Sequence, residues 1–126
     1  MRAQRRRDTT PERALRSELH RRGLRFRIQR RVIPEVRRTA DIVFGPARVV
    51  VDVRGCFWHG CPTHFASPKA NAEWWREKIE HNRIRDADTD ARLQEAGWEV
   101  VVVWEHEDIA MSADRVETTV RTKRTQ

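Results

Sequence analysis

The sequence Val-Val-Val-Asp-Val-Arg-Gly-Cys-Phe-Trp-His-Gly-Cys-Pro-Thr-His, residues 49–64, is the stretch that decides the fold and the site of this chain. Its first five residues form a β-branched run that only Asp52 interrupts, which predicts a buried strand. The remainder is a short loop that holds both cysteines of the protein and two of its five histidines. A strand that leads into a loop this rich in metal-ligating side chains indicates a functional site.

Signals for helices and strands lie on both sides of this stretch. Thr10-Pro11-Glu12 starts a helix with a threonine cap, an early proline and an acidic first turn. Gly23 and Gly97 each stop a helix. The expected elements are a helix from Thr10 to Gly23, strands over 25–29, 39–44 and 48–53, a long helix from about 67–71 to Gly97, a strand over 98–104, and a short final helix capped by Ser112.

Length and charge limit the class of protein. With 126 residues we expect a single domain over 1–126, with a flexible basic arm at 1–8 and a frayed tail at 122–126. Residues 1–39 carry 14 arginines against four acidic residues, a net charge of +10 within a total of +7. A localised basic lobe predicts a nucleic-acid partner, although a solvated tail or an arginine-rich codon usage would give the same charge. No membrane-length apolar run or signal peptide is visible, so we expect a cytoplasmic protein.

The loop after the strand predicts a zinc site. Cys56, Cys61 and His64 offer three ligands over a short span, which suits tetrahedral zinc, although the two cysteines could instead form a disulfide or an inert pair. The fourth ligand is either His106, after the strand that ends at Trp104, or His59. If His59 is not a ligand, it is free to act as a general acid or base near a phosphate.

Two aspartates predict a second, catalytic metal. Asp41 and Asp52 lie on neighbouring strands that are otherwise rich in Val and Ile, where a carboxylate is costly unless it is paired or metal-bound. Two carboxylates brought together bind Mg²⁺, which activates water and stabilises phosphoryl charge. The alternative is that both are strand-end aspartates in salt bridges to arginines. Of the two, Asp41 is the stronger candidate, because Asp52 could point outward.

Aromatic and basic side chains predict contacts with DNA. Phe57 and Trp58 lie between the zinc ligands, and rigid exposed aromatics can wedge between base pairs. Trp74 and Trp75 could join them, although one of the two could face the core. Along the same helix, Lys78, Asn82 and Arg85 share a face that is either solvated or laid on phosphates.

Together these residues resemble the Vsr family of DNA mismatch endonucleases, from about residue 1 to residue 107. The most specific part is Gly55-Cys56-Phe57-Trp58-His59-Gly60-Cys61 after a valine strand. The other matching pieces, in the family's order, are Thr10-Pro11-Glu12, Arg22 to Arg27, Ala40 to Phe44, Trp75, Lys78-Ile79, Asn82, Arg85-Asp86, Gly97-Trp98 and Val103-Trp104-Glu105.

The resemblance implies a restriction-endonuclease-like α/β fold with three layers, a mixed central sheet flanked by helices in the order αβββαβα, and a structural zinc site. It implies Mg²⁺-dependent nicking of duplex DNA beside a T:G mismatch in very short patch repair. Asp41 would be the metal-binding aspartate, His59 the catalytic histidine and Glu12 the acid of the first helix. Phe57, Trp58 and Trp75 would be the intercalating aromatics.

Three positions depart from the family pattern. Ala40 replaces a proline before the aspartate, and Arg54 stands where a histidine or aspartate is expected. His106 replaces a zinc cysteine, which favours it as the fourth zinc ligand. Asp52 restores the spaced acidic and basic residues of the wider PD-(D/E)xK nucleases.

The resemblance also sets the remaining expectations. We expect a monomer associated with the bacterial nucleoid, acting on mismatched duplex DNA, with mismatch-repair or DNA-methyltransferase proteins as partners. The alternatives are a nickase of the same family used in restriction or other DNA-damage processing, and a zinc-stabilised DNA-binding module without catalysis.

Overall fold

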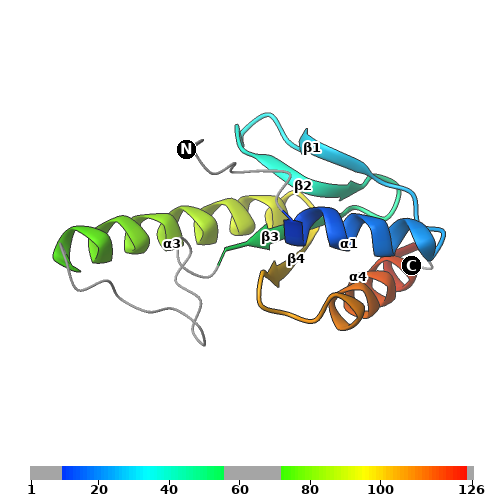
Figure 1. The fold of residues 1–126 in the computed structure, drawn as a ribbon. Helices are drawn as coiled ribbons and strands as arrows, with labels where there is room; N and C mark the ends of the chain where they lie inside the picture. The colour runs from blue at the N-terminus through cyan, green and yellow to red at the C-terminus, as the bar shows by residue number, and fades with distance from the viewer. Residues whose placement is uncertain (1–9, 56–71, 125–126) are drawn as a thin grey trace.

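The computed structural model describes residues 10–55 and 72–124 (Figure 1). In this part of the chain the elements are α1 (Thr10–Arg21), β1 (Arg27–Arg31), β2 (Thr39–Phe44), β3 (Val49–Arg54), α3 (Ala72–Glu95), β4 (Glu99–Trp104) and α4 (Ile109–Arg124). The expected order of elements and the α/β class are confirmed.

The four strands form one mixed sheet in the order β1-β2-β3-β4. β1 pairs with β2, and β2 with β3, in antiparallel fashion. β3 and β4 are parallel, with six residue pairs from Val49↔Glu99 to Arg54↔Trp104. Parallel neighbours need a long connection, and the segment between these two strands includes the 24-residue helix α3. The carboxyl ends of β3 and β4 therefore lie side by side at one edge of the sheet.

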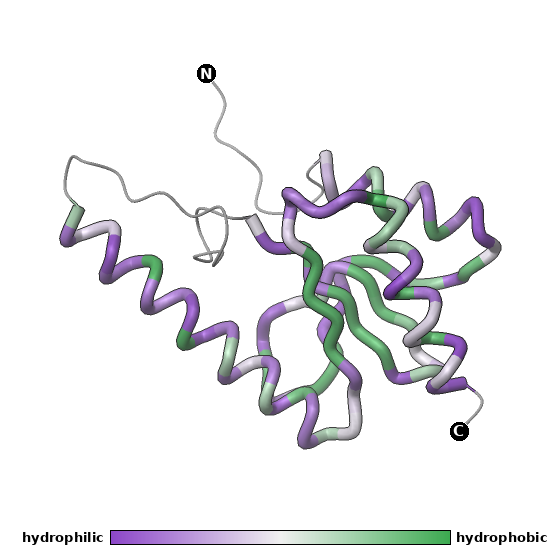
Figure 2. Tube along the Cα trace, turned by 90° about the horizontal axis from the view of Figure 1, so that it is seen from below, coloured by the Kyte–Doolittle hydropathy of each residue, from purple (hydrophilic) through white to green (hydrophobic). Residues whose placement is uncertain are grey.

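Apolar side chains cover both faces of the sheet. Val49 and Val51 of β3 join Leu15 and Leu19 of α1 and Val116 of α4 in one buried cluster. On the opposite face, Val50 packs with Ala40, Val43 and Leu93 of α3. Helices α1 and α4 therefore cover one face and the carboxyl-terminal part of α3 the other, while the rest of α3 extends beyond the sheet as a largely hydrophilic rod (Figures 1 and 2).

The two predicted helix stops are confirmed. Gly23 and Gly97 have φ angles of +82° and +92°, in the left-handed region that glycine adopts without a steric penalty. Backbone bonds then close each helix end, from the Leu24 amide to the Leu19 carbonyl (3.1 Å) and from the Trp98 amide to the Leu93 carbonyl (2.9 Å).

The main differences from the predicted boundaries concern β1 and the last helix. β1 covers Arg27–Arg31 rather than 25–29, because its position is set by pairing with β2 rather than by its own alternation. The last helix begins at Ile109 and is capped by Asp108, whose Oδ2 accepts a bond from the Met111 amide (3.0 Å), so Ser112 lies inside the helix. That helix continues to Arg124, past residue 122, where we expected the tail to begin.

Within the described ranges, no helix is both long and apolar enough to cross a membrane.

The packing of α1 on the sheet generates a stability prediction. Leu19 is completely buried, so Leu19→Ala should lower the free energy of unfolding by about 2–5 kcal/mol, through lost burial and an unfilled cavity. Met111 is 70% exposed, and Met111→Ala should change it by less than about 0.5 kcal/mol. Urea denaturation followed by circular dichroism measures both. Equal effects would contradict the assigned core.

Candidate active site

The sheet is irregular at Asp41. The β2–β3 ladder runs from Phe44↔Val49 to Ile42↔Val51 and stops before Asp41. Ala40 and Val43 pack on the same face although they are three residues apart, so the alternation of β2 slips by one residue at Asp41. The Val53 amide donates to Asp41 Oδ2 at 2.7 Å, so the carboxylate takes up a backbone donor of β3. Asp41 is thus fixed between two strands by its own side chain.

The surroundings of Asp41 disfavour its negative charge. Burial, together with the charges of Asp52 and Glu12, raises the pKa of the Asp41 carboxyl to about 8, against a lowering by the Val53 amide and by Arg16. A carboxyl whose pKa is raised by burial and by other carboxylates is a recurrent feature of catalytic and cation-binding sites. The predicted role of Asp41 therefore has an electrostatic basis in the fold.

Glu12 belongs to the same acidic group. It lies in the first turn of α1 and is only 1% exposed. Its Oε2 accepts a hydrogen bond from Gln29 Nε2 at 2.8 Å, and Arg16 Nη1 lies 3.9 Å from the same oxygen. Position in the sequence gave Glu12 no role beyond favouring the start of a helix. In the fold, α1 buries it where its charge acts on Asp41.

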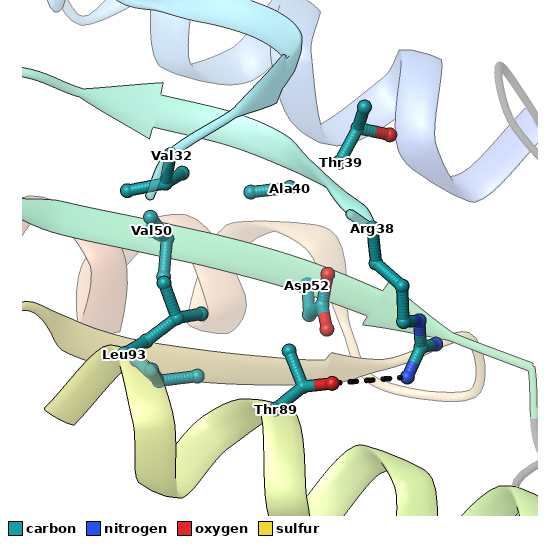
Figure 3. A pocket seen from close by; sticks show the side chains of 9 residues that line it. Val32, Arg38, Thr39, Ala40, Val50, Asp52, Thr89 and Leu93 are labelled. Atoms are coloured by element: carbon teal, nitrogen blue, oxygen red, sulfur yellow. Dashed lines mark hydrogen bonds between the residues drawn. The ribbon is translucent and has the colours of Figure 1, made fainter. Parts of the chain in front are cut away.

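Asp52 points to the other side of the sheet, where it lines a small pocket between β2, β3 and α3. Arg38, Thr39 and Thr89 supply the other polar side chains of this pocket (Figure 3). Arg38 donates to the Thr89 hydroxyl at 3.4 Å. Burial and the charge of Asp90 raise the pKa of Asp52, while the nearby arginines Arg54 and Arg38 lower it. Asp52 thus influences Asp41 electrostatically but lies in a more polar environment.

Arg54 is held by carboxylates of β3 and α3. Its Nη2 contacts both carboxylate oxygens of Asp90 at 2.9 Å and Oδ2 of Asp52 at 3.4 Å. Its Nε lies 3.9 Å from Asp86, which Arg38 also approaches at 3.0 Å. The expectation that aspartates pair with arginines therefore describes Asp52. Asp86 and Asp90 were missed because their partner is more than thirty residues away in the sequence.

The exposed end of α3 gathers aromatic and basic side chains. Trp74 is 56% exposed and meets the half-buried Trp75 edge to face, with ring centroids 4.7 Å apart. Lys78 Nζ lies 5.8 Å from the centroid of the Trp74 ring. Lys78 and Arg85 are exposed and Asn82 is half-buried, so the predicted face of α3 is accessible at least in part.

Several predicted site residues lie outside the described residues: Cys56, Phe57, Trp58, His59, Cys61 and His64. His106 is described and lies exposed in the turn after β4. Within 10–55 and 72–124, no three His, Cys, Asp or Glu side chains are grouped closely enough to hold a metal ion by themselves.

The raised pKa of Asp41 generates a prediction about stability and pH. Because the folded protein holds this proton up to about pH 8 and the unfolded chain releases it near pH 4, the contribution of Asp41 to stability falls as the pH rises between these values. Asp41→Asn should therefore gain stability relative to the parent on going from pH 6 to pH 8, by about 1–3 kcal/mol.

Chemical denaturation of metal-free protein at both pH values measures this difference. Added Mg²⁺ should reduce it, because the ion favours the charged carboxylate. A stability difference between the variant and the parent that does not change with pH would contradict the electrostatic environment described for Asp41.

Comparison with known proteins identifies the family. The model of the family described as DNA mismatch endonuclease Vsr matches residues 1–64. The type II nicking enzyme V.XorIIP of Xanthomonas oryzae pv. oryzae is 46% identical over 101 residues, which cover 79% of this chain and 72% of that protein.

Two further relatives support the same family assignment. The type II nicking enzyme V.NaeI of Lentzea aerocolonigenes is 43% identical over 111 residues, or 86% of this chain and 67% of the relative. The DNA mismatch endonuclease Vsr of Escherichia coli K12 is 42% identical over 106 residues, which cover 83% of this chain and 66% of that protein. This chain therefore belongs to the Vsr family and is a DNA endonuclease.

Proposed function

We propose that this chain nicks one strand of duplex DNA beside a T:G mismatch, in a reaction that depends on Mg²⁺. The observation that carries the proposal is the acidic group of Asp41, Glu12 and Asp52 around the point where β2 and β3 separate. Burial and the negative charges of Asp52 and Glu12 raise the proton affinity of Asp41, and negative charge gathered in this way repels a DNA phosphate. The site suits a phosphodiester substrate only if a cation binds at Asp41.

The residues present fit a magnesium ion. Mg²⁺ in phosphoryl-transfer sites is held by one or two carboxylates and keeps several waters, so it needs no cage of three protein ligands. Asp41 would hold it, and Asp52 would help through its negative charge, which acts on Asp41 from the other side of the sheet. When bound, the ion supplies a more acidic water and stabilises the charge of the phosphoryl group. Glu12 would act from α1 by orienting water at the same place, and the Val53 amide keeps Asp41 fixed.

His59 would move the proton in this reaction. It lies five residues after the end of β3 in the sequence, and β3 carries Asp52 of the acidic group near that end. An imidazole exchanges protons readily near neutral pH, so His59 could take a proton from the attacking water or give one to the leaving oxygen.

Mismatch selectivity would come from aromatic side chains. Phe57, Trp58 and Trp75 would enter the base stack, and Lys78, Asn82 and Arg85 would contact the backbone. The exposure of Trp74 and Lys78 beside Trp75, at the end of α3 farthest from the core, supports this use of the helix. A mispaired step unstacks at a lower cost than a paired one, so a wedge favours it. The E. coli relative is named a mismatch endonuclease.

A second substrate class has its own support. The relatives from Xanthomonas and Lentzea are named type II nicking enzymes, which supports the alternative that this chain nicks DNA in a restriction context. The chemistry of the acidic group would be unchanged, and only the preferred DNA would differ.

We also propose a structural zinc ion on Cys56, Cys61, His64 and His106. The parallel pairing of β3 and β4 supports it, because the Glu105 amide donates to the Arg54 carbonyl at 2.9 Å. The Glu105 side chain also lies beside Gly55. Cys56 is the next residue after Gly55 in the sequence, and His106 is the next residue after Glu105. Four ligands of this kind would join the two strand ends.

The nicking proposal predicts the behaviour of Asp41→Asn. With Mg²⁺, the parent should convert supercoiled plasmid to the open circle and cut T:G duplexes faster than paired ones. Asp41→Asn should lose at least about a hundredfold in rate, because the ion loses its main ligand. Its affinity for DNA should stay equal or rise, since a charge near phosphate is removed.

Asp88→Asn is the matched control, because Asp88 is an exposed carboxylate that pairs with Arg92 on the same helix. It should nick at the parent rate. Full activity of Asp41→Asn, or of the parent in EDTA with zinc retained, would overturn the magnesium proposal. Tight DNA binding without nicking by the parent would favour a non-catalytic module.

The zinc proposal predicts about one equivalent of tightly held zinc per chain. His106→Ala should lose most of that metal and lower the melting temperature, because structural zinc contributes folding free energy. Elemental analysis of protein purified without chelator measures the metal. His81→Ala, at an exposed position of α3, should keep both the zinc and the melting temperature. Zinc retained in His106→Ala would exclude it as a ligand.

A further inference from the structure

Gln29 has an unusual backbone conformation directly opposite Asp41. The β1–β2 ladder pairs Ile28 with Ile42 and Arg30 with Ala40, but the intervening Gln29–Asp41 pair is missing from it. The φ angle of Gln29 is +53°, in the left-handed region that residues with a side chain rarely adopt. A non-glycine residue in this region persists only when its surroundings impose it, and such residues gather at functional sites.

The side chain of Gln29 explains why glycine does not occupy this position. Its Nε2 donates to Glu12 Oε2 at 2.8 Å, across the space between β1 and α1. Glycine or asparagine would adopt this φ angle more readily, but glycine has no side chain and asparagine is one methylene shorter. The chain therefore accepts an unfavourable backbone conformation in order to bring an amide donor to one buried carboxylate.

The neutrality of this donor is informative. Three of the five residues of β1 are arginine, yet the residue that contacts Glu12 is glutamine. An arginine here would pair with Glu12 and cancel its charge. An amide fixes the orientation of the carboxylate without adding a second positive charge to that of Arg16, which lies 3.9 Å from the same oxygen, so Glu12 can still help to attract a cation. Residues that orient a ligand or a catalytic carboxylate in this way contribute to metal affinity and rate without touching the substrate.

We propose that Gln29 is a positioning residue that fixes the Glu12 carboxylate for its work beside the cation on Asp41. This inference rests on the proposed magnesium-dependent nicking. It assigns to a strained residue of β1 a function that the sequence motifs do not indicate.

The test combines two substitutions at Gln29. Gln29→Gly removes the donor and relieves the backbone, so its melting temperature should equal or exceed that of the parent. Its kcat for nicking should fall by about 10–100-fold, and the Mg²⁺ concentration for half-maximal rate should rise, with DNA affinity unchanged. Gln29→Glu keeps the length but replaces the donor with a second carboxylate, and it should lose activity to a similar extent.

Arg48→Gly is the matched control. Arg48, in the turn between β2 and β3, is the other non-glycine residue of the described chain with a left-handed φ angle, at +58°. The glycine variant relieves a similar backbone conformation away from Glu12 and should nick at the parent rate. An equal loss in Arg48→Gly and Gln29→Gly would mean that the effect is a general one on the backbone, which would overturn the proposal.

A double variant tests whether Gln29 acts through Glu12. Added to Glu12→Gln, Gln29→Gly should cause no further loss of rate, because the carboxylate it positions is already absent. Additive losses would overturn the positioning role, as would parent-like nicking and Mg²⁺ dependence in Gln29→Gly. If Glu12→Gln is impaired and Gln29→Gly is not, this inference alone fails.

A measurement without DNA separates the two proposals. The rise in melting temperature on adding MnCl₂ should be smaller in Gln29→Gly and in Glu12→Gln than in the parent and in Arg48→Gly. If the parent nicks no DNA, the proposed function fails, but this comparison still decides whether Gln29 prepares Glu12 for a cation. An unchanged Mn²⁺ effect in Gln29→Gly would overturn the inference.

Discussion

The parallel pairing of β3 with β4 is the constraint on which the rest of the structure depends. It requires a long connection, part of which is α3, and it places the carboxyl ends of both strands at one edge of the sheet. Asp52, Arg54 and the start of the Cys-rich loop come from one of these ends, and His106 comes from the other. β2 adds Asp41 from the antiparallel side. Asp52 and His106 are therefore brought to the same end of the sheet by this pairing, and Asp41 is held there through the Val53 amide.

Most of the fold follows from local signals, because the elements are strongly marked. The β-branched runs predicted β3 and β4, and Gly23 and Gly97 predicted the ends of α1 and α3. The errors occur where local signals compete. Asp108 and Ser112 are both good helix caps, and only the bond from the Met111 amide shows that Asp108 is used. The position of β1 was misjudged by two residues, since its exposed side chains carry no clear alternation.

The candidate site was predictable only in part, for a physical reason. A carboxylate in an apolar strand is costly, so Asp41 could be recognised without any partner. Gln29 could not, because its conformation is imposed by contacts between β1, β2 and α1 and leaves no mark in the sequence around it. The α3 carboxylates that hold Arg54 could not be predicted either, since an aspartate on a helix is normally interpreted as a solvent-exposed residue.

Those α3 carboxylates explain how a mostly hydrophilic helix is positioned. Its buried residues, Ile79, Asp86 and Leu93, recur every seven residues, and the middle one is charged. Arg54 of β3, held by Asp90 and close to Asp86, thus replaces part of the apolar contact that would normally hold a helix on a sheet. Removing one partner from a buried ion pair costs about 3–5 kcal/mol, and the contact of Arg54 Nη2 with both Asp90 oxygens also fixes direction. The other end of α3 carries Trp75 and Lys78. The ion cluster of Arg54, Asp86 and Asp90 therefore helps to set how these two side chains are oriented relative to Asp41. At Arg54 the family pattern led us to expect a histidine or aspartate. The structure explains the arginine as the residue that ties α3 to β3.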